Sequence, residues 1–160
     1  MRVLVLDQAK TTGYAIYDND KLMEYGVIEI GKKNMVYEEM LPVAKVEFAN
    51  LIGKVRPDKI VLEDIQLQNG NVSTYKKLAM LMGVLICLLH EMSLPHEMVS
   101  PTRWQCGLGI KGKKRAEKKA NTVLFVKETF SIDDISEDEA DAIAMGLYVL
   151  QKGSENNDYN

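Results

Sequence analysis

The segment RVLVLDQAKTTGYAI, residues 2–16, opens with an apolar run. Its four consecutive apolar residues lack the alternation of a half-exposed strand, so they predict a strand that is buried on both faces. Asp7 ends this strand. The segment KIVLED, residues 59–64, repeats the pattern and places Glu63 after its own apolar run. The sequence therefore predicts two central strands that each end in a carboxylate.

The rest of the chain predicts further strands and helices around these two. Two strands joined by a turn at 18–21 follow the first central strand. A short strand is expected at 95–100, and helices are expected at 35–55, at 75–91, from 101, from the basic segment to about 130, and at 141–152. Such an order is typical of a mixed α/β sheet. We expect one domain at 1–152, followed by a disordered polar tail at 153–160.

The overall composition is that of an ordinary globular protein, with 46% hydrophobic and 27% charged residues. The net charge of -3 gives no overall field that would announce a nucleic-acid partner. The apolar run near Met1 is too short for a secretory signal. Cys87 and Cys106 have neither disulfide-like nor metal-like spacing. Together these features predict a cytoplasmic protein.

Charge is distributed unevenly along the chain. The segment 111–119 has six basic residues in nine positions, and the segment 131–141 has six acids in eleven. A basic patch beside an acidic one suits a site that grips phosphates and holds metal ions. Two solvated faces of opposite sign would give the same pattern, so composition leaves both interpretations open.

The segment 75–91 contains twelve consecutive residues, 78–89, without a polar side chain. That run is too short to span a membrane, so it predicts a helix in the protein core and no membrane partner. A helix that is apolar on every side needs cover all round, and one domain of this size supplies only part of it. We therefore expect a homodimer that forms through this helix.

Four carboxylates are expected to meet at one edge of the sheet. Asp7 and Glu63 end two strands, and ligands of parallel α/β sheets collect at the carboxyl ends of the strands. Asp138 and Asp141 are three residues apart at a helix start, so they project from nearly the same face. The helix dipole and amide capping explain the acids at 137–139. They explain Asp141 less well, because the apolar pattern has already begun there.

A metal ion would account for Asp141. It lies between two alanines, which would let this turn lie close to the sheet, where a carboxylate costs free energy unless a cation meets it. Hard divalent cations such as Mg2+ take carboxylate oxygens and water. Two such ions ~3.5 to 4 Å apart can activate a water and stabilise the leaving oxygen of a phosphodiester. His90 and His96 fit no ligand pattern, and we assign them structural roles.

Four segments, VLVLDQAKTTGYAI, KIVLED, RAEKK and DEADAIAMG, together resemble the RuvC-type Holliday-junction resolvases of the ribonuclease H-like superfamily. The likeness covers residues 2–150, and the small, divergent form looks like a bacteriophage member. It implies a ribonuclease H-like mixed five-stranded sheet flanked by helices. It also implies a dimeric, metal-dependent, structure-specific DNA endonuclease that makes paired cuts in four-way junctions and other branched DNA. A phage-encoded protein would act in the cytoplasm of the bacterial host.

The resemblance also implies the functional residues, position by position. Asp7, Glu63, Asp138 and Asp141 match the family's catalytic carboxylates, which hold two Mg2+ or Mn2+ ions. Lys118, in Ala-Glu-Lys at a helix start, matches a basic catalytic residue near the scissile phosphate. The expected DNA-binding residues are Lys111, Lys113, Lys114, Arg115, Lys118, Lys119, Gln66 and Tyr75.

Two places depart from the family pattern. Gln8 and Ala9 replace the usual Pro-Gly after the first aspartate, a difference that we interpret as loop variation. Gln66 stands where cellular members commonly carry an aromatic residue that stacks on a junction base. Tyr75 or Trp104 could supply a ring instead, although each is more often a packing residue.

Three other functions stay open. A related ribonuclease H-like enzyme that processes RNA would share the first strand and its loop, but the apolar helix and the basic segment favour the resolvase. A branched-DNA-binding module without catalysis would keep the basic segment and would not need four acids. An actin-like phosphotransferase fragment would resemble residues 7–13, but the chain is too short for its two lobes.

Overall fold

The computed structural model describes residues 1–32, 34–67 and 70–157, with the side chains of 154–157 excepted. Its centre is a five-stranded sheet in the order β3-β2-β1-β4-β5. Antiparallel pairs join β1 (Arg2–Asp7), β2 (Thr11–Asp18) and β3 (Lys21–Glu29). Parallel pairs join β1 to β4 (Lys59–Glu63) and β4 to β5 (His96–Val99). The predicted mixed five-stranded sheet is confirmed.

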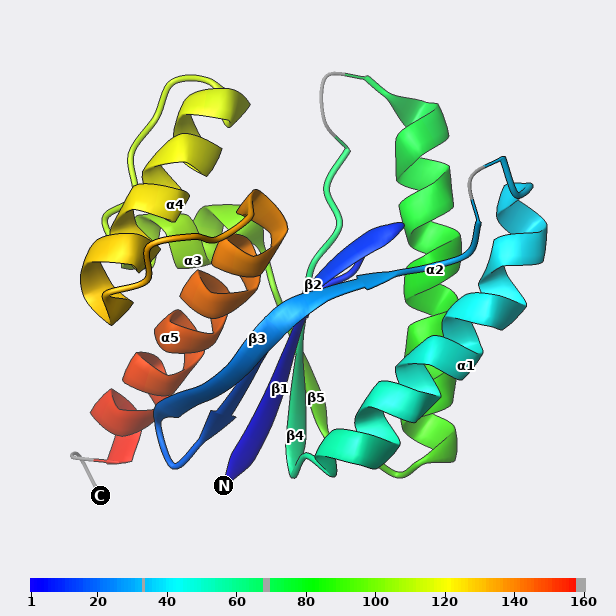
Figure 1. The fold of residues 1–160 in the computed structure, drawn as a ribbon, viewed down its shortest axis with the longest axis horizontal. Helices are drawn as coiled ribbons and strands as arrows, with labels where there is room; N and C mark the ends of the chain where they lie inside the picture. The colour runs from blue at the N-terminus through cyan, green and yellow to red at the C-terminus, as the bar shows by residue number, and fades with distance from the viewer. Residues whose placement is uncertain (33, 68–69, 158–160) are drawn as a thin grey trace.

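Helices cover both faces of the sheet (Figure 1). One face carries α1 (Tyr37–Val55) and α2 (Val72–Glu91), and the other carries α3 (Pro101–Gly107), α4 (Arg115–Phe130) and α5 (Glu137–Asn157). Each predicted helix is present, so the α/β class expected from the sequence is confirmed.

The last helix is longer than predicted. We expected α5 to end at Lys152 and a disordered tail to follow, but the helix continues to Asn157. Gln151, Lys152 and Gly153 are exposed and need no apolar cover, and Gly153 continues the helix instead of ending it in a left-handed conformation. The predicted end of the helix is therefore wrong, whereas the disorder of the tail stays a prediction, and residues 158–160 lie outside the described residues.

The alternation of side chains along β1 and β4 orients the acids that end these strands. Leu6 packs toward α1 and α2, whereas Val5 and Val61 pack toward α5. Because alternate residues of a strand point to the same face, Asp7 follows Val5 and Glu63 follows Val61. Both carboxylates therefore lie on the α5 side of the sheet.

Small residues let α5 lie directly on the sheet. Gly13 of β2 is paired with Asp7 of β1. A Cβ added at Gly13 would collide with the main-chain oxygen of Asp138, and one added at Gly146 would collide with the Tyr17 ring. The acidic first turn of α5 is thus held against the strand next to Asp7.

Helix α2 is only partly covered by its own chain. Leu81, Leu85 and Leu89 are buried in the core against α1 and the sheet, while Tyr75 and Met80 are exposed. Among the described helices, α2 alone is long and apolar enough to cross a membrane, and 28% of its most apolar window is buried. Its buried leucines belong to the core of this domain, so length and composition are weak evidence for a membrane span.

Candidate active site

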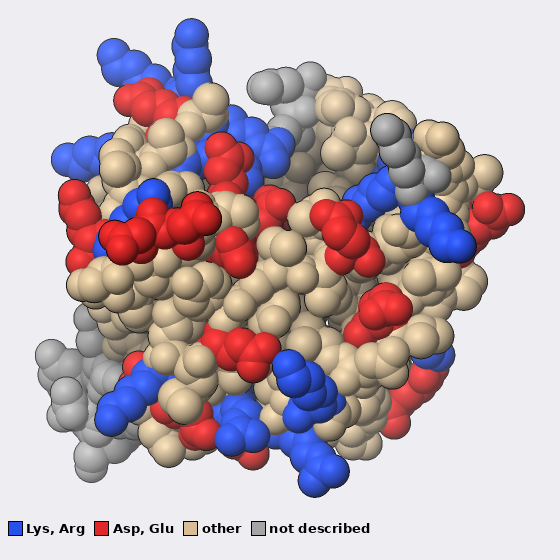
Figure 2. Space-filling model, viewed as in Figure 1, with Lys and Arg blue, Asp and Glu red and all other residues tan. Residues whose placement is uncertain are grey.

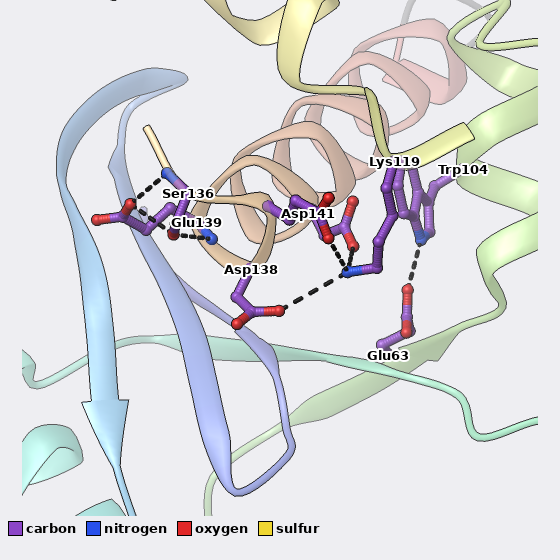
Figure 3. Close-up of polar contacts among 8 residues, drawn as sticks. Glu63, Trp104, Lys119, Ser136, Asp138, Glu139 and Asp141 are labelled. Atoms are coloured by element: carbon purple, nitrogen blue, oxygen red, sulfur yellow. Dashed lines mark hydrogen bonds and ion pairs between the residues drawn. The ribbon is translucent and has the colours of Figure 1, made fainter. Parts of the chain in front are cut away.

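Two of the predicted carboxylates lie side by side at the ends of β1 and β4. The register sets Leu6 opposite Leu62, so the next residues, Asp7 and Glu63, are neighbours at the same edge of the sheet. The indole Nε1 of Trp104 donates a hydrogen bond of 3.0 Å to Glu63 Oε1 (Figure 3). Trp104 of α3 therefore fixes the position of the Glu63 carboxylate.

The other two carboxylates lie in the first turns of α5. A capping box forms this helix start, because Ser136 N donates to Glu139 Oε2 at 2.8 Å and Glu139 N donates to Ser136 Oγ at 3.3 Å (Figure 3). Glu139 has the capping role that we expected for it. The side chains of Asp138 and Asp141 are 35% and 9% exposed, and both carboxylates face the ammonium of Lys119 (Figure 3).

Lys119 of α4 supplies the cation that meets these acids. Its Nζ lies 3.0 Å from Asp141 Oδ2, 3.7 Å from Asp138 Oδ1 and 3.7 Å from Glu137 Oε2. Its side chain is only 17% exposed. The Asp141 carboxylate therefore has a charged partner from another helix, which the sequence could only leave open.

Lys118, the basic residue expected beside the reacting phosphate, lies differently. Its stem packs against Gly112, and it forms no ion pair within the described residues. Both lysines line the groove beside the site. Only Lys119 reaches the carboxylates. The lysine closest to the acids is therefore Lys119, whereas the family resemblance indicated Lys118.

Burial and mutual repulsion make this cluster difficult to ionise fully. Burial, reinforced by the charge of Asp141, raises the pKa of Asp7 to about 7. Burial also raises the pKa of Glu63, with a further contribution from Asp7. The pKa of Asp141 is raised by burial, although Lys119 opposes that shift. Burial alone would lower the pKa of Lys119, but its acidic neighbours outweigh burial and the pKa is raised.

The donor set fits a hard divalent cation, because all four candidate ligands are carboxylates. Asp141 Oδ1 is buried and has no hydrogen-bond partner in the described part of the chain. Such an atom costs free energy unless a cation or donor reaches it. As the described side chains lie, however, no three of their His, Cys, Asp or Glu residues surround a common ion position. The residue types fit a metal centre, and the geometry would need side-chain movement to close it.

A basic groove of about 680 Å3 opens beside the acids. Its basic lining consists of Lys113, Lys114, Arg115, Lys118 and Lys119. Figure 2 shows Lys and Arg side chains gathered over α4, next to acidic ones. Glu117 Oε2 accepts a hydrogen bond of 2.8 Å from Lys113 N, and Asn121 Nδ2 donates one of 2.7 Å to the Lys111 oxygen. These bonds hold the basic segment on α4, while the exposed Lys111 is outside the groove lining.

A smaller hollow of about 280 Å3 lies over the carboxylates themselves. Gln66 and Tyr75 both line it, so these two predicted DNA-contacting residues lie beside the site. Trp104 cannot offer a ring to a base, because it is fully buried and bonded to Glu63. Its interpretation as a packing residue is correct.

Gln8 is a site residue that the sequence did not reveal. Its Nε2 donates a hydrogen bond to the main-chain oxygen of Glu63 and lies 3.9 Å from Met82 Sδ of α2. The side chain is 4% exposed and lies on the face opposite to Asp7, as alternation requires. Gln8 thus ties the ends of β1 and β4 together, which is more than the loop variation that we assumed.

The sequence did not reveal the contacts of Lys119 and Trp104 with the acids, for a common reason. Lys119 meets an acid 22 residues away and Trp104 meets one 41 residues away, each from a different helix. No local spacing marks such pairs. The one available signal was Asp141 itself, an acid in an apolar turn that required some cation.

Relatives of the chain are found among known proteins, although no family model matches it. The chain is 30% identical over 152 residues to the crossover junction endodeoxyribonuclease RuvC of Fusobacterium nucleatum, covering 91% of this chain and 77% of that protein. It is 31% identical over 102 residues to the RuvC of Corynebacterium glutamicum, covering 64% of this chain and 44% of that one.

Solved resolvase structures share the fold. RuvC of T. thermophilus in complex with Holliday junction substrate has a TM-score of 0.72 at 15% identity, covering 92% of both chains. Fowlpox virus resolvase in complex with Holliday junction DNA has a TM-score of 0.64 at 17% identity, covering 95% of this chain and 98% of that one. The low identities to the solved structures show only a shared fold. The Fusobacterium relative, in contrast, is similar in sequence along most of both chains. The chain belongs to the RuvC family of crossover junction endodeoxyribonucleases.

Proposed function

We propose that this protein is a magnesium-dependent endonuclease that resolves four-way DNA junctions by paired phosphodiester cuts. The observation that carries the proposal is the convergence of four carboxylates from β1, β4 and α5 beside a groove lined by basic side chains. Acids alone would suit many metal sites, and basic residues alone would suit any DNA-binding surface. Their juxtaposition suits hydrolysis of a phosphodiester.

The four carboxylates would hold the metal ions. Of the two acids on α5, Asp141 is the more enclosed ligand, with a side chain 9% exposed, and Asp138 is the more open one, with a side chain 35% exposed. Two bound Mg2+ ions would supply activation of the attacking water and stabilisation of the leaving oxygen. Asp138, at the open side, is suited to orient that water.

Two uncharged side chains would keep the ligands in position. Trp104 holds Glu63 through its indole N–H, and Gln8 holds the Glu63 main chain from the other face of the sheet. A residue whose main chain and carboxylate are both held loses less freedom when it takes a ligand.

The basic groove would bind the DNA backbone. Lys119 reaches the acids and Lys118 lines the groove beside them, and both would contact the phosphate that is cut. The flanking phosphates would meet Lys113, Lys114 and Arg115, with Gln66 and Tyr75 at the rim of the hollow. Phosphate contacts position DNA without reading its sequence, so the recognition of branched DNA would depend on shape.

Paired cuts require two active sites, and α2 would supply them through a twofold dimer. The exposed side of α2 that includes Met80 and Cys87 is the surface that a second copy would cover. The expected particle has twice the chain mass of 18.0 kDa in sedimentation experiments. We further propose action in the cytoplasm, and bacteriophage origin stays a prediction from the resemblance.

The direct test of the proposed function is a comparison of substrates. Wild-type protein in Mg2+ is incubated with matched four-way, three-way, linear-duplex and RNA–DNA hybrid substrates. We expect paired, symmetrical cuts in the four-way junction at a higher rate than in the other three. Preferred cutting of the hybrid would favour the RNA-processing alternative, and binding without cutting would favour the non-catalytic one.

A further inference from the structure

Lys119 occupies a place that suits a metal ion better than an ordinary surface lysine. Its ammonium lies within 3.7 Å of three acidic side chains, Glu137, Asp138 and Asp141, and its side chain is 17% exposed. Figure 3 shows it pointing from α4 into the space between Asp141, Asp138 and Glu63. An ammonium there compensates negative charge that the hollow would otherwise leave unpaired.

The ammonium and a metal ion would compete for the same carboxylate oxygens. Lys119 Nζ is 3.0 Å from Asp141 Oδ2, whereas Mg2+ needs its oxygens at about 2.0 to 2.1 Å in a nearly octahedral shell. The described acids do not surround a common ion position as they lie, and the lysine is the group between them. A metal ion can therefore bind to these carboxylates only if the Lys119 ammonium moves away from them.

The groove gives the ammonium somewhere to go. Lys119 lines both the hollow over the carboxylates and the basic groove beside it, so its long side chain stands at the boundary of the two. In the groove it would join four other basic side chains, an unfavourable position unless a phosphate is present. The favourable partner of a displaced ammonium is thus the DNA backbone.

We propose that Lys119 is an internal counter-cation that exchanges places with the metal: it pairs with the acids in the metal-free protein and moves onto a DNA phosphate when metal ions bind. The inference rests on the proposed metal centre. Since metal binding frees a phosphate-binding group, metal and DNA each strengthen the binding of the other. The exchange also keeps the acids compensated before the substrate arrives.

The first test measures metal binding without DNA. Ca2+ is titrated calorimetrically into wild type, Lys119→Gln, Lys118→Gln and Asp141→Asn at about pH 8.5, where proton competition at the carboxylates is small. Lys118→Gln removes the same charge from the next residue, which forms no ion pair with the acids in the described structure. We expect Lys119→Gln to bind Ca2+ about 10-fold more tightly than wild type, and Lys118→Gln to differ from wild type by less than about 3-fold.

The outcomes separate this inference from the metal centre itself. If Lys119→Gln binds Ca2+ no more tightly than wild type while Asp141→Asn loses it, the metal centre stands and the exchange is refuted. If neither wild type nor Lys119→Gln binds Ca2+, both the metal centre and the exchange are refuted. An equal gain in both lysine variants would show a general charge effect and would also overturn the exchange.

The second test uses wild-type protein and so does not depend on a variant that folds. The reactivity of Lys119 toward an amine-acylating reagent is followed by mass spectrometry, with and without saturating Ca2+, against Lys127 on the same helix as an internal reference. We expect Ca2+ to raise the labelling of Lys119 at least 3-fold while that of Lys127 is unchanged. Unchanged or reduced labelling of Lys119 at Ca2+ saturation would contradict the exchange.

Discussion

The two faces of the sheet differ in the side chains that fasten their helices. On one face, α1 and α2 pack through large residues such as Phe48, Leu81 and Leu85. On the other, α5 packs through Ala140, Ala144 and other small residues, and a strand glycine meets its first turn. Large side chains give a core, whereas small ones bring a helix backbone, with its acids, down to the ends of the strands.

This difference explains why the candidate active site lies on only one face of the sheet. Both central strands end in an acid on the α5 side, where the close approach of α5 adds two more. On the opposite side, the residue after Asp7 is Gln8, and its neighbour there is Met82. Charge is thus concentrated where the packing residues are smallest, and the other face is left to packing and to the exposed side of α2.

Glycine-to-alanine substitutions give the largest expected difference between the faces. At Gly13 the new methyl group would collide with the Asp138 main chain and displace the acidic turn, so we expect cleavage to fall by at least about 1,000-fold. At Gly53 in α1, nothing lies within 4 Å, so the same change is expected to stabilise the helix by about 0.5 to 1 kcal/mol. Single-turnover cleavage and thermal unfolding measure the two effects, and near-normal cleavage by Gly13→Ala would contradict the claim that close packing at Gly13 positions the acidic turn.

The next effect concerns the pH dependence of stability without metal. Because the pKa of Asp7 is raised from 3.8 to about 7, its contribution to stability is present below pH 3.8 and is lost as the pH rises through about 7. Asp7→Asn should therefore be the more stable protein at about pH 8, by at most about 4 kcal/mol, because each pKa unit is worth ~1.4 kcal/mol. The value is an upper bound because Asp7 is partly exposed.

Thermal unfolding in EDTA from about pH 4 to 8 checks this expectation. The difference in stability between Asp7→Asn and wild type should shrink steadily as the pH falls. A variant that is less stable than wild type at about pH 8 would mean that the Asp7 charge is well compensated in the metal-free protein.

A smaller effect is expected from the hydrogen bond that fixes Glu63. Trp104→Phe keeps an aromatic ring in the core but removes the donor to a buried carboxylate, at a cost of about 1 to 3 kcal/mol. Tyr17→Phe is the matched control, because the Tyr17 hydroxyl donates to the Ile143 oxygen at 2.7 Å on the same face without touching the acids. We expect both variants to lose stability but only Trp104→Phe to lose cleavage, by about 10-fold.

Cleavage is compared under conditions in which both variants are fully folded. Equal cleavage rates of Trp104→Phe and Tyr17→Phe would show that Trp104 does not position Glu63 for catalysis. It would then be a packing residue only, as its sequence context indicated.

The smallest effect is expected from the basic groove. Lys114→Ala with Arg115→Ala should lower the slope of log affinity for junction DNA against log salt by about 1 to 2, since each lost phosphate contact contributes ~0.9. Lys54→Ala removes an exposed charge outside the groove, from α1 near β3, and should leave the slope unchanged. Binding titrations at several salt concentrations distinguish the two variants. Equal slopes would show that the basic segment is a solvated face that does not contact DNA.

The sequence predicted the strands and the acids because both depend on short-range patterns. Unbroken apolar runs marked β1 and β4, and each run pointed to the acid that ends it. Strand alternation and a three-residue helical spacing are local rules, so the sequence alone was enough to place Asp138 with Asp141. The order of helices followed from the same patterns.

What the sequence could not supply were the contacts made across the fold. Lys119 reaches the acids only because α4 packs beside α5, and Gly13 matters only because α5 crosses β2 at that residue. Gln8 looked like a loop residue because its role is to bridge two strands that are distant in the sequence. The length of α5 was misjudged because polar residues can extend a helix that needs no cover there.

The most direct test of the account is single-turnover cleavage of a four-way junction in Mg2+ by wild type, Asp141→Asn and Glu139→Gln. Asp141 belongs to the proposed metal centre, whereas Glu139, two residues before it, caps the helix through Ser136. We predict that Asp141→Asn loses cleavage by at least about 1,000-fold while it still binds the junction, and that Glu139→Gln cuts at a rate close to wild type. Full cleavage by Asp141→Asn would contradict the claim that these four carboxylates form the catalytic centre.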